Sequence, residues 1–232
     1  MSSGYDAPHI LEKVRRATKA VLAGEAVAER DSVALSAAEY SLPLLVGLLY
    51  VASRSNGSLS VLDFGGSLGS GYWQTRKFLQ HLRVQWSIVE QPHFVRVGQA
   101  EIANDVLRFY FSIDDSLAAG RPDVILLSGV LQYIELPFSL LDDVFGTATP
   151  HIIIERTQFF VEDLPDRLTV ENVHPSIYEA SYPSWFFNLS NFRKFIAASK
   201  YRCVEEFDSW ERWDVDGAAA QNKCLLLEYR RS

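Results

Sequence analysis

The stretch VLDFGGSLGSGYW, residues 61–73, joins a short apolar run to a segment rich in glycine and serine. The apolar run up to the aspartate at position 63 is typical of a buried strand, and the glycines that follow are typical of a bend. Glycine has no Cβ, so a bend of this composition lets another group come close to the main chain. That group is a helix, another strand or a ligand, and which of them applies decides the function.

The chain as a whole has 232 residues, enough for one large core, so a single domain is the default expectation. Its formal net charge of -7 argues against a nucleic-acid-binding surface, which needs clustered Lys and Arg. Cys203 and Cys224 are too few for a disulfide framework or a thiolate metal site, which fits a reducing cytoplasm.

Export and membrane insertion are not expected from the sequence. The N-terminus lacks the apolar stretch of a secretory signal. The strongest apolar run, 42–52, has eleven residues, whereas a membrane-spanning helix needs about 20. This run therefore predicts a core helix.

Strand-like and helix-like segments alternate from residue 59 onward, which is the pattern of crossover units on a parallel sheet. The strand cores lack strict alternation of apolar and polar residues, as expected for strands covered on both faces. The sequence therefore favours an α/β doubly wound sheet. Strands are expected at 59–64, 84–90, 107–111, 123–128 and 151–156, and helices at 73–82, 93–104 and 136–146.

Both ends of the chain depart from this alternation. Residues 9–24 have the apolar spacing of an amphipathic helix, and Ser36 with Glu39 has the form of a capping box for a second helix, which Pro43 kinks or restarts. Residues 156–189 are expected to form a long excursion rather than a regular crossover. Ser190 is expected to cap a helix, and the runs 202–213 and 221–230 are expected to form an antiparallel hairpin.

The glycine bend discriminates between three classes of ligand site at the edge of such a sheet. A phosphate-binding loop needs a Lys after its last glycine, and none follows Gly71. A dinucleotide fingerprint needs a glycine spacing that this bend does not have, which disfavours but does not eliminate it. S-adenosylmethionine carries no phosphate, so its site needs only a close approach to the backbone.

The bend resembles the first motif of class I methyltransferases, with Asp63, Gly65, Ser67 and Gly69 at the motif positions and Gly66 as an additional glycine. Glu90 ends the next strand, 25 positions beyond Gly65, where a carboxylate accepts hydrogen bonds from ribose hydroxyls. A solvated strand end explains Glu90 equally well.

The fourth strand and its exit, DVILLSGVLQYIE at 123–135, are similar to the fourth motif of methyltransferases that act on small molecules. Together with the segments VEQPHF, IIIERT and YPSWFFN, these motifs resemble a family of bacterial methyltransferases over residues 59 to 190. The resemblance implies a Rossmann-like sheet of seven strands with the last strand antiparallel. It also implies S-adenosylmethionine as the cofactor and leaves the acceptor unnamed.

Further site residues follow from position in such a sheet. Glu155 and His174 are the candidate catalytic bases for a hydroxyl acceptor, and Ser128 and Tyr133 are candidates to lie beside the methyl donor. Asp114 follows the third strand, where related folds hold the adenine, although turn solvation explains it equally well. The aromatic residues expected either to roof an acceptor pocket or to fill the core are Tyr178, Tyr182, Trp185, Phe186 and Phe187.

The sequence thus favours a cytoplasmic methyltransferase domain at 56–232 with an N-terminal helical extension at 1–55. Its expected partner is a small-molecule methyl acceptor, with a hydroxyl of a glycan or secondary metabolite as the preferred target and no metal required. An NAD(P)-dependent oxidoreductase and a non-catalytic cofactor-binding member of the fold are the alternatives. Whether residues 1–55 cap the pocket or form the surface of a homodimer is open.

Overall fold

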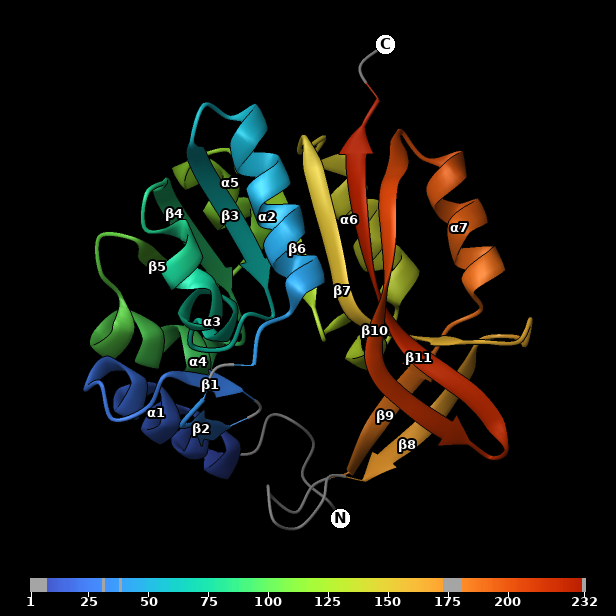
Figure 1. Ribbon diagram of the computed structural model, residues 1–232, viewed down its shortest axis with the longest axis horizontal. Helices are drawn as coiled ribbons and strands as arrows, with labels where there is room; N and C mark the ends of the chain where they lie inside the picture. The colour runs from blue at the N-terminus through green and yellow to red at the C-terminus, as the bar shows by residue number, and fades with distance from the viewer. Residues whose placement is uncertain (1–7, 31, 38, 173–180, 231–232) are drawn as a thin grey trace.

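A seven-stranded sheet forms the centre of the computed structural model, which describes residues 8–30, 32–37, 39–172 and 181–230 (Figure 1). Its strand order is β10-β11-β7-β6-β3-β4-β5. The strands are β3 (Ser58–Phe64), β4 (Arg83–Val89), β5 (Leu107–Tyr110), β6 (Val124–Ser128), β7 (His151–Phe160), β10 (Tyr201–Val215) and β11 (Ala218–Tyr229).

Strand directions confirm the predicted fold class. The pairs β3–β4, β3–β6, β4–β5 and β6–β7 are parallel, and β11 pairs antiparallel with both β7 and β10. The last strand of the chain therefore lies between β7 and β10 and runs against the other strands. The carboxyl ends of β3, β4, β6 and β7 meet at one edge, where ligands bind in open α/β sheets.

Helices cover both faces of this sheet. The helical elements between the strands are α2 (Leu42–Arg54), α3 (Ser70–Leu79), α4 (Pro92–Val97), a π-helical turn (Gly98–Ile102), α5 (Ile113–Ala119), a 3-10 turn (Leu131–Tyr133), α6 (Pro137–Gly146) and α7 (Leu189–Ala198). One buried cluster joins α2, α3 and α4 to one face through residues such as Leu48, Leu79 and Phe94. A second joins α6 and α7 to the other face through Leu141 and Phe192. The sheet is thus doubly wound.

The N-terminal segment packs on the same core as the sheet. It begins with α1 (Pro8–Leu22), close to the expected helix, and Val14 and Val21 belong to the cluster of the α2 face. A two-stranded hairpin of β1 (Ala28–Arg30) and β2 (Val33–Leu35) follows, although the segment was expected to be helical. Short strands of three residues leave little periodicity from which a hairpin is predicted.

The predicted capping box of Ser36 and Glu39 is wrong. Helix α2 begins at Leu42, and Ser41 is its N-cap, with the Ser41 hydroxyl accepting a hydrogen bond from the Leu44 amide at 3.3 Å. Pro43 therefore lies in the first turn, where its missing N–H costs no helical hydrogen bond. Glu39 forms an ion pair with Arg30 at 3.4 Å instead.

The segment 156–189 is more regular than expected. Strand β7 continues to Phe160, and β8 (Arg167–Asn172) pairs antiparallel with β9 (Ser181–Phe186). Helix α7 is capped by Asn188 and not by Ser190, because the Asn188 Oδ1 accepts the Asn191 amide at 2.7 Å. The C-terminal hairpin of β10 and β11 confirms the expected pair.

Membrane insertion of the described helices is not supported by their length and composition. Within residues 8–230, apart from the undescribed gaps, no helix is both long and apolar enough to cross a bilayer.

Replacement of Gly98 by alanine tests the packing that places β5 in the sheet. A Cβ at Gly98 would lie 2.4 Å from the Phe109 ring, whereas a Cβ at the helical Gly146 meets nothing within 4 Å. We expect Gly98→Ala to lower the free energy of unfolding by about 1–3 kcal/mol because overpacking strains a rigid ring. The matched Gly146→Ala variant should be neutral or slightly stabilising in the same urea titration. Equal stability of the two variants would contradict the packing.

Candidate functional site

The glycine bend follows β3 at the carboxyl edge of the sheet. Gly65 and Gly69 have φ angles of +73° and +97°, which side chains with a Cβ rarely adopt, and Ser67 has a φ of +55°. The Gly65 amide donates a hydrogen bond to the Val89 carbonyl at 2.9 Å, which ties the bend to β4. Gly69 then caps the start of α3.

At two of the glycines, neighbouring side chains of the protein leave no room for a Cβ. A Cβ at Gly65 would lie 2.6 Å from the Val130 side chain, and one at Gly66 would lie 2.5 Å from the Asp63 carboxyl group. The bend thus packs against two neighbours, so the glycines at these positions do not by themselves indicate a ligand.

Asp63 lies beneath the bend with 2% of its surface exposed. Its Oδ2 accepts a hydrogen bond from the Trp86 indole N–H at 2.9 Å. The pKa of Asp63 is raised to about 7, mainly by burial and also by the charges of Glu90 and Glu155, although the Trp86 hydrogen bond lowers it. The structure therefore places Asp63 as a support of the bend, connected to β4.

Glu90 follows the last residue of β4 and faces the bend. Its carboxylate accepts hydrogen bonds from the Gln91 amide at 2.6 Å and from the Ser67 amide. Burial raises the pKa of Glu90, and these two backbone donors lower it. The hydroxyl oxygen of Ser67 is buried and has no hydrogen-bond partner in the described part of the chain. A carboxylate and a hydroxyl thus lie together where a ribose was expected.

The exit of β6 contributes a second group of predicted residues. Ser128 ends the strand, and its hydroxyl donates a short hydrogen bond to Glu155 Oε2. Tyr133 donates a hydrogen bond from its hydroxyl to Glu171 Oε2 at 3.0 Å, and its ring meets Tyr182 edge-on at 5.1 Å. Burial and the Glu171 charge raise the pKa of Tyr133, so its hydroxyl stays protonated.

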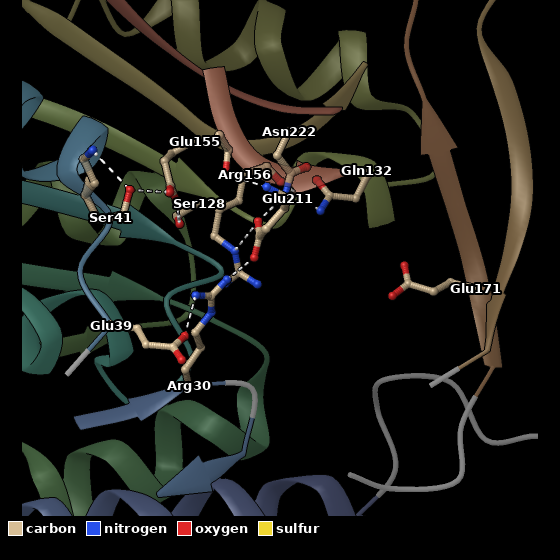
Figure 2. Close-up of polar contacts among 12 residues, drawn as sticks. Arg30, Glu39, Ser41, Ser128, Gln132, Glu155, Arg156, Glu171, Glu211 and Asn222 are labelled. Atoms are coloured by element: carbon tan, nitrogen blue, oxygen red, sulfur yellow. Dashed lines mark hydrogen bonds and ion pairs between the residues drawn. The ribbon is translucent and has the colours of Figure 1, made fainter. Parts of the chain in front are cut away.

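Glu155 lies on β7 and is 4% exposed. Besides Ser128, the Ser41 hydroxyl donates to its Oε1 at 2.8 Å (Figure 2). Burial raises the pKa of Glu155, while Arg156 and the two hydroxyls lower it. The role of base stays a prediction, and it requires one hydroxyl to move so that an acceptor reaches the carboxylate.

Other predicted residues lie away from this group. Asp114 is exposed in the first turn of α5, a helix that the sequence analysis did not predict. Phe186 and Phe187 are buried in apolar clusters, and Trp185 packs beside Phe187. His174 and Tyr178 lie outside the described residues.

A set of charged residues near Glu155 was not predicted (Figure 2). Arg30 of β1 makes a short contact with Glu211 of β10, and Arg156 Nε lies 3.8 Å from the same carboxylate. The charge of Arg156 also lowers the pKa of Glu155. Serine before Leu-Pro is a recognisable signal for the Ser41 cap, whereas no local pattern identifies Glu211.

A surface hollow of about 830 Å³ lies at the other edge of the sheet. It is lined by Arg54, His151 and Glu228 among others, at the end of α2 and the beginning of β7. This hollow is separate from the glycine bend, and burial lowers the pKa of its His151, which favours the neutral ring.

Comparison with known proteins gives structural but not sequence relatives. No family model matches the sequence, and no curated protein sequence matches it. The N-terminal domain of EvdMO1, solved in the presence of SAH and D-fucose, has a TM-score of 0.55 and 14% identity over 95% of this chain and 96% of that chain. A SAM-dependent methyltransferase from Methanosarcina mazei has a TM-score of 0.53 and 9% identity over 84% of this chain and 100% of that chain.

The glycopeptide N-methyltransferase MtfA, complexed with SAM, has a TM-score of 0.51 and 12% identity over 84% of this chain and 96% of that chain. At these identities the likeness concerns the fold alone. The chain therefore has the Rossmann-like fold of class I methyltransferases, as the strand order already indicated.

Asp63→Asn tests the buried carboxyl under the bend. Since its pKa rises from 3.8 to about 7 on folding, the unfolded chain releases this proton between about pH 4 and pH 7 while the folded chain keeps it. The stabilisation that the protonated Asp63 adds to the free energy of unfolding is therefore fully present below about pH 4. It is lost as the pH rises to about 7.

Asparagine keeps an oxygen for Trp86 and does not titrate. We expect the free energy of unfolding of Asp63→Asn minus that of the unchanged protein to rise across this interval, by at most about 4 kcal/mol, since one pKa unit corresponds to about 1.4 kcal/mol. Urea titrations at several pH values measure it. A difference that is independent of pH would contradict the raised pKa.

Proposed function

We propose that this chain is an S-adenosylmethionine-dependent methyltransferase that transfers a methyl group to a hydroxyl of a small molecule. The observation that carries the proposal is the contact of the Glu90 carboxylate with the Ser67 amide of the glycine bend. It puts a carboxylate beside the backbone of the glycine bend at the carboxyl edge of β3 and β4, which is the position of cofactor sites in such sheets.

The residues at this edge fit the cofactor. The buried Ser67 hydroxyl lacks a partner in the described chain, and Glu90 offers a carboxylate beside it, so the two suit the hydroxyl groups of a ribose. We assign Asp63, Gly65, Gly66 and Gly69 to shaping the bend, and Asp114 to the adenine end. Bound S-adenosylmethionine supplies an electrophilic methyl group on a sulfonium. SAM or SAH accompanies EvdMO1 and MtfA in their crystals, and D-fucose accompanies the former, which supports a sugar hydroxyl.

Methyl transfer depends mainly on holding the acceptor in line with the methyl group. We assign this positioning to Ser128 and Tyr133 at the exit of β6, since Tyr133 remains protonated and donates a hydrogen bond. Glu155 Oε2 takes the proton of the methyl acceptor's hydroxyl once the Ser128 hydroxyl no longer donates to this oxygen. His174 is the alternative base. The contact of Arg30 with Glu211 supports the assignment of residues 1–55 as a cap over the acceptor side.

Glu90→Ala tests the cofactor site. We expect the Kd for S-adenosylhomocysteine in calorimetry to rise about 10- to 100-fold, since hydrogen bonds to a charged group contribute about 1.5–3 kcal/mol. The exposed Glu135 serves as the matched control, and Glu135→Ala should leave the Kd unchanged.

Two outcomes of this titration would count against the proposal. One is an unchanged affinity in a folded Glu90→Ala protein. The other is binding of NAD in place of S-adenosylhomocysteine, which would favour the oxidoreductase. Tight cofactor binding without turnover on hydroxyl, amine and carboxylate acceptors would favour the non-catalytic alternative.

Glu155→Gln tests the base. Glutamine keeps an oxygen for one of the two serine hydroxyls and presents an NH₂ group to the other, whose oxygen can accept it, but glutamine cannot accept the proton. We therefore expect kcat to fall about 10²- to 10⁴-fold with little change in cofactor Kd. If kcat is unchanged in Glu155→Gln and falls in His174→Ala, the base is His174.

A further inference from the structure

Four polar side chains beside the proposed catalytic group form one connected set, which we call the polar wall: Gln132, Arg156, Glu211 and Asn222 (Figure 2). Gln132 Nε2 donates to the Arg156 carbonyl at 3.1 Å, and Arg156 Nε lies 3.8 Å from Glu211 Oε2. Asn222 Nδ2 donates to the same carboxylate oxygen. The wall therefore joins the exit of β6 to β7, β10 and β11.

The orientation of both amides in the polar wall is determined by their partners. A carbonyl and a carboxylate accept hydrogen bonds only, so the groups facing them must be the NH₂ groups of Gln132 and Asn222. The remaining atoms, Gln132 Oε1 and Asn222 Oδ1, are consequently acceptors.

Neither of these two oxygens has a hydrogen-bond donor in the described part of the chain, although both side chains belong to residues that are 3% exposed. A buried acceptor without a donor costs about 1–3 kcal/mol. Two such oxygens in one connected set point to a ligand that brings its own donors.

The charged groups of the polar wall form ion pairs with each other and with Arg30. Arg30 and Arg156 both contact Glu211, and Arg30 also pairs with Glu39 at 3.4 Å. Two guanidinium groups thus face two carboxylates. An anionic ligand would have to displace Glu211 from both arginines, whereas a neutral ligand leaves the ion pairs intact.

The polar wall adjoins the proposed catalytic group. Arg156 follows Glu155 directly, and Gln132 lies four positions beyond Ser128, whose hydroxyl contacts Glu155. Glu171, which accepts a hydrogen bond from the Tyr133 hydroxyl, lies apart from the polar wall in Figure 2. An acceptor whose reacting hydroxyl is near Glu155 is therefore next to the wall.

We propose that the polar wall recognises the methyl acceptor and that this acceptor is a neutral polyhydroxylated molecule of the sugar class. Two of its hydroxyl groups donate hydrogen bonds to Gln132 Oε1 and Asn222 Oδ1, and Glu211 stays paired with Arg30 and Arg156. This inference rests on the proposed function, because it assigns the acceptor of the same site.

The experiment uses the full chain and begins with calorimetry of S-adenosylhomocysteine binding. Saturation-transfer NMR on the loaded protein then compares methyl α-D-glucopyranoside with glucuronate, in which a carboxylate replaces the hydroxymethyl group of the sugar, and with anisole, which has no hydrogen-bond donor. We expect the neutral glycoside to bind and both others to bind at least about tenfold more weakly, since displacing a partly buried ion pair or leaving the two oxygens without donors costs about 1.4 kcal/mol or more.

Variants of the polar wall test the two oxygens. Gln132→Met and Asn222→Leu remove the acceptor atoms at similar volume, and each should weaken glycoside binding about tenfold with unchanged cofactor affinity. Asn191→Leu, at an exposed position of α7, is the matched control. Thermal unfolding identifies variants that fold. If Asn222→Leu does not fold, Gln132→Met keeps the test decisive, because Gln132 contacts the Arg156 carbonyl and the Tyr133 hydroxyl, whereas Asn222 contacts the charged Glu211 carboxylate.

The outcomes separate the two proposals. Failure of cofactor binding contradicts both. Three results, each with intact cofactor binding, overturn only the assignment of a neutral sugar to the polar wall. They are a preference for glucuronate or anisole over the glycoside, no glycoside binding, and equal glycoside binding by Gln132→Met and the unchanged protein.

Discussion

The hydrogen bond between the Trp86 indole and the buried Asp63 carboxyl group is the interaction on which the rest of the site depends. It connects β3 to β4, and the carboxyl group leaves no room for a Cβ at Gly66 directly above it. The bend must therefore follow the surface of this carboxyl group. Its course places the Ser67 amide against the Glu90 carboxylate, so the candidate cofactor site depends on a group that does not itself face the open edge.

A bulge in β7 has a similar effect on the side proposed to hold the methyl acceptor. Thr157 pairs with Lys223 and Ile154 with Leu225, so Glu155 and Arg156 together face one residue of β11. Arg156 has a φ of +52° there. The extra residue lets two neighbours in sequence serve different partners: Glu155 contacts Ser128 and Ser41, while Arg156 contacts Glu211.

Much of the fold was predictable because its signals are local. The alternation of apolar runs with amphipathic segments predicted the five parallel strands and most helices within a few residues. Predictions failed where several residues competed for one role. Ser36 and Ser190 are good caps, but Ser41 and Asn188 hold the positions at which the chain enters its helices. The hairpin β8–β9 was missed because Pro165, just before it, and Pro183, within β9, are typical of irregular segments.

The sequence by itself determined the order of the five parallel strands, the bend after residue 64 and the acidic residue at the end of the next strand. These follow from apolar periodicity, glycine content and spacing, which act over a few residues. Only the tertiary structure decided which groups meet: Glu155 contacts a serine 114 positions away, and Arg30 contacts Glu211 across 181 positions. No local pattern encodes such pairs, because they depend on how strands and the N-terminal segment pack once the core has formed. The two acceptor oxygens of the polar wall are of this kind.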